Sequence, residues 1–156
     1  MPEQANLSEL DSALVRELQN NGRKNNRDIA EAVGVAPSTS LERIRTLRQR
    51  GIIQGFHADI QLQALGRHVQ ALIAVRIRPP SRTNIEAFRD WVSELPETLG
   101  VFVVSGEDDF LIHVAVPQTD SLYAFVIDRL TERPEVADVK TSVVYEHLRR
   151  WVIEPL

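Results

Sequence analysis

Residues 29–53 read IAEAVGVAPSTSLERIRTLRQRGII, and this stretch decides how the first part of the chain folds. Its apolar residues recur at helical spacing, and Gly34 is placed to end one helix in a left-handed turn. Pro37 suits the first position of the next helix, which is predicted to run to about Arg50 and to stop at Gly51. Two helices joined by a short glycine-containing turn form the helix-turn-helix pattern.

Another helix is predicted before this pair, because leucines recur every four residues from Leu10 to Leu18. Ser8 is placed to cap its start, and Asn25 is placed to cap the second helix. Three helices of this size bury little apolar surface alone. We therefore expect residues 52–58 to add a β-hairpin that packs on them as a wing.

The third helix carries a polar face suited to nucleic acid. Spacing predicts that Leu41, Ile44 and Leu47 point inward, which leaves hydroxyls, arginines and one acid outside. Arginine can pair with guanine, a carboxylate can accept from cytosine, and hydroxyls suit phosphate oxygens. We expect this helix to lie in the major groove of double-stranded DNA. The predicted DNA-binding residues are Arg27, Pro37, Ser38, Thr39, Ser40, Glu42, Arg43, Arg45 and Thr46.

The charge distribution agrees with this interpretation. Residues 20–50 carry seven basic and three acidic side chains, whereas residues 51–156 carry ten basic and fifteen acidic ones. A basic segment joined to an acidic one indicates two tasks, one of which involves a polyanion. Charged helix faces that are merely solvated are the alternative explanation.

Composition excludes several classes of protein. The 156 residues include no cysteine, which rules out disulfides, thiolate metal sites and a cysteine nucleophile. No apolar run approaches the ~20 residues of a membrane span, and the N-terminus is polar, so the sequence predicts a soluble, cytoplasmic protein. The four histidines show no metal-ligand spacing, and no catalytic or phosphate-binding motif is present. We expect neither an enzyme nor a metal or other cofactor.

The N-terminal pattern resembles the Lrp/AsnC family of transcription regulators, also called feast/famine regulators. The segments that carry the resemblance are LSELD at 7–11, IAEAVGVAPS at 29–38, LERIRTL at 41–47 and GII at 51–53. Ala36 departs from the pattern, because family members often have a serine cap there. The resemblance runs nearly end to end and implies a regulator that responds to a small effector.

Beyond the helices, the chain divides into a connector and a second domain. Residues 54–69 form either a hinge or a strand that pairs with a second subunit, and the sequence leaves both open. Strands are then predicted over residues 71–77, 99–104, 110–116 and 136–145. Helices are predicted to start in a Thr83–Glu86 capping box and at an Asp120 cap. The order βαββαβ is ferredoxin-like, so the predicted fold class is α+β. The predicted domains are a winged helix-turn-helix over 1–53, a linker over 54–69 and a ligand-binding and oligomerisation domain over 70–156.

Helices on one face of such a sheet leave the other face bare. Its predicted apolar side chains are Leu72, Ala74, Phe102, Val104, Leu111 and Ala115. A bare apolar face predicts a dimer or larger assembly. The family resemblance implies dimers formed through the sheet that stack into tetramers or octamers.

The acidic segment SGEDDF at 105–110 is the predicted effector site, because it resembles the family signature S-G-x-x-D-[YF]. Gly106 permits a tight turn, Asp109 can accept from an ammonium group, and turn amides can hold a carboxylate, a combination that suits a free amino acid. The resemblance places effectors near this loop and the last strand, between dimers. The predicted effector-binding residues are Ser105, Gly106, Asp108, Asp109, Thr141, Ser142 and Val143. An ordinary acidic β-turn is the alternative.

Three functions remain open at this stage. The first is a sequence-specific transcription regulator that responds to a small effector, for which an amino acid is the expected class. The second is an architectural DNA-binding protein with little effector control. The third is a small-molecule sensor or enzyme with an incidental N-terminal domain.

Overall fold

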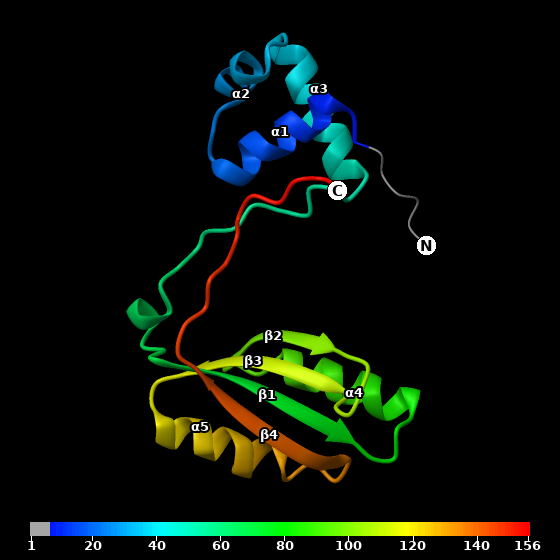
Figure 1. Cartoon of the computed structure of the whole chain (residues 1–156), viewed down its shortest axis with the longest axis vertical. Coiled ribbons are helices and arrows are strands. Elements are labelled where there is room, and N and C mark those ends of the chain that lie inside the picture. The colour runs from blue at the N-terminus through cyan, green and yellow to red at the C-terminus, as the bar shows by residue number, and fades with distance from the viewer. Residues whose placement is uncertain (1–6) are drawn as a thin grey trace. The chain divides into compact units, whose positions relative to one another are not determined.

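The computed structural model describes residues 7–156, so the first six residues of the predicted 1–53 domain lie outside the described residues. The chain divides into two compact units (Figure 1). One unit spans residues 60–147. The other contains the chain up to Asp59 together with residues 148–156. The end of the chain, which the sequence placed in the ligand-binding domain, therefore packs with the N-terminal helices.

The first unit contains three helices: α1 (Glu9–Asn20), α2 (Asn26–Val33) and α3 (Pro37–Gln49). The predicted caps are confirmed, since the Ser8 side chain accepts a hydrogen bond from a first-turn backbone N–H of α1 and Asn25 does the same for α2. Gly34 ends α2 with φ of 72°, in the left-handed region. The buried core of Leu14, Ile29 and Leu47 joins the three helices, which confirms the helix-turn-helix domain.

The segment after α3 does not form the predicted wing. Residues 52–58 contain no strand and pair with no other strand in the described chain. Instead, the backbone N–H groups of Ile52 and Ile53 donate to the Leu47 carbonyl oxygen, at 3.0 and 3.2 Å. Both isoleucine side chains pack against the helical core. The hairpin prediction is wrong because these residues close the end of α3 and cover the core directly.

The second unit has the predicted βαββαβ order. Its elements are β1 (Val69–Ile77), α4 (Arg82–Ser93), β2 (Thr98–Val103), β3 (Phe110–Val116), α5 (Thr119–Phe125), the π-helical turn η2 (Val126–Leu130) and β4 (Val136–Val144), preceded by the short 3₁₀ helix η1 (Leu62–Leu65). The sheet is antiparallel in the order β2-β3-β1-β4. Both helices pack on one face of it, over a core that includes Ile73, Phe88, Phe110 and Phe125 (Figure 1). The α+β fold class is thereby confirmed.

Two helix starts differ from the prediction. Helix α4 begins after Ser81, whose hydroxyl accepts from the Asn84 backbone N–H at 3.1 Å, so the Thr83–Glu86 capping box is wrong. Helix α5 already includes Thr119, which places Asp120 in its first turn and not at the cap. In each case the residue that caps the helix lies two positions earlier than expected.

The side chains predicted to form a bare apolar face of the sheet differ in their exposure. Phe102 and Leu72 are 58% and 39% exposed. Ala115, in contrast, is fully buried, because the segment before β1 reaches this end of the sheet and the Arg67 guanidinium donates to the Ala115 carbonyl oxygen at 2.9 Å. Within residues 7–156, no helix combines the length and apolar character that a membrane crossing requires.

Candidate functional site

The orientation of α3 decides which of its side chains can meet a ligand. Ser40 and Leu47 are buried and Ile44 is half-buried, so the inward stripe runs through positions 40, 44 and 47. Leu41 is 53% exposed, which corrects the prediction that it points inward. Ser40 is fully buried and its hydroxyl has no hydrogen-bond partner among the described residues. Ser40 therefore cannot contact DNA, and its place in the predicted set is wrong.

The opposite side of α3 is exposed along its whole length. Ser38, Glu42, Arg45 and Gln49 are spaced to form one stripe facing away from the buried residues. Gln49 was missed by the sequence analysis, although correct placement of the inward stripe would have included it. The remaining exposed members of the predicted set are Arg27, Pro37, Thr39, Arg43 and Thr46. The Thr46 hydroxyl donates to the Glu42 carbonyl oxygen at 3.1 Å and so stays close to the helix.

Arg43 has a partner within the protein. Its Nη1 lies 3.5 Å from Oδ2 of Asp11 on α1. The Asp11 side chain is 7% exposed, and its second oxygen, Oδ1, has no partner in the described chain. The Arg43 side chain is about half exposed. Arg43 therefore balances a buried negative charge and joins α3 to α1, a task that the sequence analysis did not foresee.

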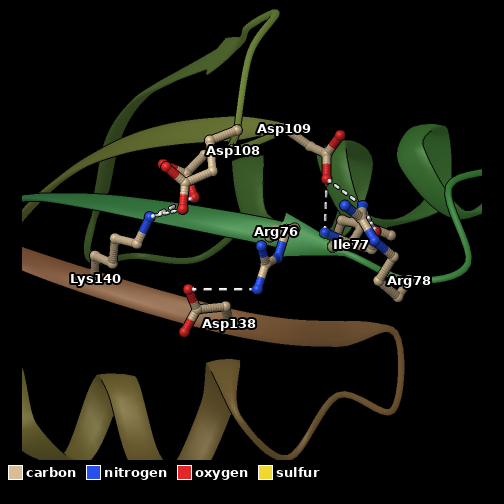
Figure 2. A network of polar contacts seen from close by, with 8 residues as sticks. Arg76, Ile77, Arg78, Asp108, Asp109, Asp138 and Lys140 are labelled. Carbon is tan, nitrogen blue, oxygen red and sulfur yellow. Dashed lines mark hydrogen bonds and ion pairs between the residues drawn. The ribbon is translucent and has the colours of Figure 1, made fainter.

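The hairpin between β2 and β3 carries the acid loop, which we define as residues 105–109. Gly106 has φ of 124°, a conformation that other residues rarely adopt. Asp109 is turned toward the end of β1 (Figure 2). Its Oδ2 accepts from the Ile77 backbone N–H at 2.7 Å and lies 3.7 Å from Arg78 Nη1. Asp109 thus fastens the loop to β1, and that oxygen is already engaged.

The other two acids of the loop meet a cation from β4. Lys140 Nζ lies 2.8 Å from Glu107 Oε1. The same nitrogen lies 3.5 Å from Asp108 Oδ1 (Figure 2). The hydrogen bond between Lys140 and Glu107 lowers the pKa of Glu107 and raises the pKa of Lys140. Lys140 was not singled out in the sequence because 32 positions separate it from Asp108. The antiparallel pairing of β4 with β1 brings it to the loop.

The predicted contacts on β4 lie farther along the strand. Thr141, Ser142 and Val143 are exposed, and they pair with Ile73, Leu72 and Ala71 of β1. No hydrogen bond or ion pair in the described chain joins them to the acid loop. One chain therefore gathers Ser105, Gly106, Asp108 and Asp109 on one loop but does not unite them with the β4 residues.

A pair of histidines lies on the helix-free side of the sheet. His113 Nε2 is 2.9 Å from Gln70 Oε1, and the His113 and His147 rings are 5.6 Å apart, edge to face. Burial, and to a smaller extent the charge of His147, lower the pKa of His113. No set of three or more acidic or histidine side chains in residues 7–156 is arranged to hold a metal ion.

Comparison with known proteins identifies the architecture. The family model for the AsnC-type helix-turn-helix domain matches residues 7–48, and the model for the Lrp/AsnC ligand-binding domain matches residues 70–150. The chain belongs to the Lrp/AsnC family. It is therefore a transcriptional regulator of the Lrp/AsnC type, with a helix-turn-helix and a ligand-binding domain, and its relatives are regulators and not enzymes.

Known Lrp/AsnC proteins match this chain over nearly its whole length. The HTH-type transcriptional regulator AldR of Mycolicibacterium smegmatis is 37% identical over 92% of this chain and 84% of its own length. A leucine-responsive regulatory protein of Rhizobium meliloti is 33% identical and covers 92% of both chains. The crystal structure of a Neisseria meningitidis transcriptional regulator in complex with L-methionine is 30% identical, with a TM-score of 0.85 over 92% of this chain and 93% of that one.

Proposed function

We propose that this protein is a homodimeric, sequence-specific DNA-binding regulator whose assembly on DNA responds to a free amino acid. The observation that carries the DNA-binding part is the exposed stripe of α3. It presents a hydroxyl, a carboxylate, a guanidinium and an amide on the side opposite the core. Because its target is DNA, we place the protein in the cytoplasm.

We assign base contacts to the stripe and phosphate contacts to its surroundings. Glu42 and Arg45 carry the groups that discriminate cytosine and guanine in the major groove. Ser38, Thr39, Thr46 and Arg27 suit phosphate oxygens, and Pro37 opens the helix whose first amides face them. Two copies then present two recognition helices to half-sites about one helical turn apart, or a multiple of that.

The test of this assignment compares two arginines. In anisotropy titrations on a duplex selected in vitro by the full-length protein, Arg45→Ala should lose roughly 1–3 kcal/mol and accept more bases at one position. Arg27→Ala should weaken binding evenly across sequences and reduce the salt dependence. An equal loss on random DNA for Arg45→Ala would remove it from base recognition.

For the effector, we propose a zwitterion held where Lys140 meets the acid loop. Lys140 suits the carboxylate of a free amino acid, and Asp108 suits its ammonium group. The bound L-methionine of the Neisseria relative supports this class of ligand. Thr141, Ser142 and Val143 would contribute from the neighbouring stretch of β4, with a second dimer completing the site.

A thermal-shift screen of the twenty amino acids, with light scattering on each positive, tests the effector part. A ligand that binds only the folded protein raises its apparent stability by mass action. We expect at least one amino acid to raise the melting temperature and also to change the oligomeric state. Lys140→Ala should abolish both effects of that amino acid. No positive at millimolar concentration would favour an effector-independent, architectural DNA-binding protein.

A further inference from the structure

The C-terminal segment, residues 148–156, is held by a specific site on α1. Gln19 Nε2 donates to the Ile153 carbonyl oxygen at 3.0 Å, and the Ile153 backbone N–H donates to Gln19 Oε1 at 2.8 Å. One side-chain amide thus satisfies both backbone groups of one residue. This pairing depends on register, because a shift of the segment by one residue would break both bonds.

The next residue of the segment strengthens the same site. Arg16 holds the Glu154 carboxylate with two hydrogen bonds, Nε to Oε1 at 2.5 Å and Nη2 to Oε2 at 3.0 Å. Arg16 and Gln19 lie three positions apart on α1 and so share one face of the helix. The hydrogen bonds between Arg16 and Glu154 raise the pKa of Arg16 and lower the pKa of Glu154.

The surroundings of this site extend its contacts. Gln19, which holds Ile153, also lines a groove of about 390 Å³ formed with Val15, Leu18 and residues 52–57. Within the segment, the Arg149 guanidinium stacks over the Trp151 ring at 4.2 Å. The family model ends at residue 150, so residues 151–156 lie outside the part that defines the ligand-binding domain.

We propose that α1 carries a docking site for the C-terminal segment, and that docking restrains the DNA-binding unit with a second connection to the ligand-binding unit. The first connection is the linker that crosses between the units after Asp59. The second follows β4, whose last residue, Val144, precedes the docked segment by only three residues. A unit attached at two points has less freedom than a unit attached at one, because each of its positions must satisfy both connections at once.

This restraint has a consequence for DNA, which rests on the proposed binding of paired half-sites. When the segment is docked, a dimer accepts a narrow range of half-site spacings. When it is released, each DNA-binding unit follows its half-site more freely. Release should therefore weaken the preference for one spacing more than it weakens binding to a single half-site.

The experiment uses full-length protein and an exchange of charges. The variants are Arg16→Glu, Glu154→Arg and the combination of both, which restores the opposite pairing. Arg82→Glu is the matched control, because Arg82 pairs with Glu86 on α4 at 3.7 Å and the substitution changes the charge equally. Amide hydrogen exchange at Ile153 reports docking, without DNA or amino acid present.

A second measurement reports the restraint. Each protein is titrated with a duplex selected in vitro by the wild type and with the same duplex lengthened between half-sites by about five base pairs, half a helical turn. The ratio of the two affinities measures the spacing preference.

We expect exchange at Ile153 to become about fivefold to tenfold faster in each single variant, the effect of roughly one lost hydrogen bond. The spacing ratio should fall toward one in the same variants. The combined variant should restore both quantities, and Arg82→Glu should change neither. Unprotected exchange at Ile153 in the wild type overturns the docking.

The DNA titrations distinguish a failure of the proposed restraint from a failure of the proposed function on which it rests. A spacing preference that Arg16→Glu keeps in full, despite faster exchange, overturns the restraint alone. A wild type with no spacing preference overturns the restraint and also the paired half-sites of the proposed function.

Discussion

Replacement of Arg43 by alanine should destabilise the DNA-binding unit before any DNA is added. The substitution leaves the Asp11 carboxylate, which is 7% exposed, without its only cationic partner in the described chain. Two unit charges about 4 Å apart attract by about 1 kcal/mol in water and by about 4 kcal/mol at an effective dielectric constant near 20. Because Arg43 is half exposed, we expect a loss toward the lower value, about 1–2 kcal/mol in the free energy of unfolding.

The chain offers a clean reporter for this measurement. Trp151 belongs to the unit that contains α1 and α3, whereas Trp91 lies on α4 in the other unit. In a Trp91→Phe background, urea unfolding followed by Trp151 fluorescence therefore reports the DNA-binding unit. Arg45→Ala is the matched control on the same helix, and its unfolding free energy should change by less than about 0.5 kcal/mol.

A double-mutant cycle with Asp11→Asn decides the physical cause. Asparagine removes the buried charge, so Arg43→Ala made in that background should cost far less than in the wild type. An unchanged unfolding midpoint for Arg43→Ala, together with a large loss of DNA affinity, would refute this reasoning. Arg43 would then be a base-contacting residue, as the sequence alone suggested.

Three further predictions test the fold and the acid loop. Leu47→Ala should cost about 2–5 kcal/mol of stability in urea unfolding, whereas Leu41→Ala at the exposed position should cost less than about 1 kcal/mol; equal losses would contradict the orientation of α3. Asp109→Asn should destabilise the ligand-binding unit by about 1.5–3 kcal/mol without ligand, since the Ile77 N–H loses a charged acceptor, and differential scanning calorimetry of the apo protein would detect this or disprove it. The pKa of His113 is lower in the folded protein than in the unfolded chain, so the unfolded chain binds the proton more readily and the stability of this unit should fall as the pH drops below about 6.5. His113→Gln should reduce the dependence of the melting temperature on pH between about pH 5 and 8. If the variant and the wild type show the same dependence, His113 is not its cause.

Local signals predicted the helix-turn-helix well because each depends on a few neighbouring residues. Ser8 and Asn25 cap the helices that directly follow them, and Gly34 adopts the left-handed turn that ends α2. The wing prediction failed because Ile52 and Ile53 pack on the helical core, which is a tertiary effect. The start of α4 was misplaced because Ser81 and Thr83 are both suitable caps, and it is the Ser81 hydroxyl that accepts from a first-turn backbone N–H.

Side-chain roles were harder to predict than elements. Positions 40 and 41 both continue the stripe through 44 and 47, and hydrophobicity favoured Leu41 over Ser40, whereas packing of α3 buries the smaller side chain. The part of Asp109 in holding β1 depends on a backbone N–H that lies 32 positions earlier. Such contacts follow from the pairing of strands, which the spacing of acids along one loop does not reveal.

Strand β4 links the two proposed activities. Its Lys140 pairs with the acid loop, residues 141–143 are the predicted ligand contacts, and the chain then runs through His147 into the segment docked on α1. A zwitterion whose carboxylate takes Lys140 would replace the ion pairs that Lys140 makes with Glu107 and Asp108, and would leave the Asp108 carboxylate for the ammonium group of the ligand. If the ligand binds more tightly when β4 is in one conformation than in another, that difference in affinity shifts the population toward the favoured conformation. The covalent continuation into residues 148–156 then carries the shift to α1 without any contact between ligand and DNA-binding unit.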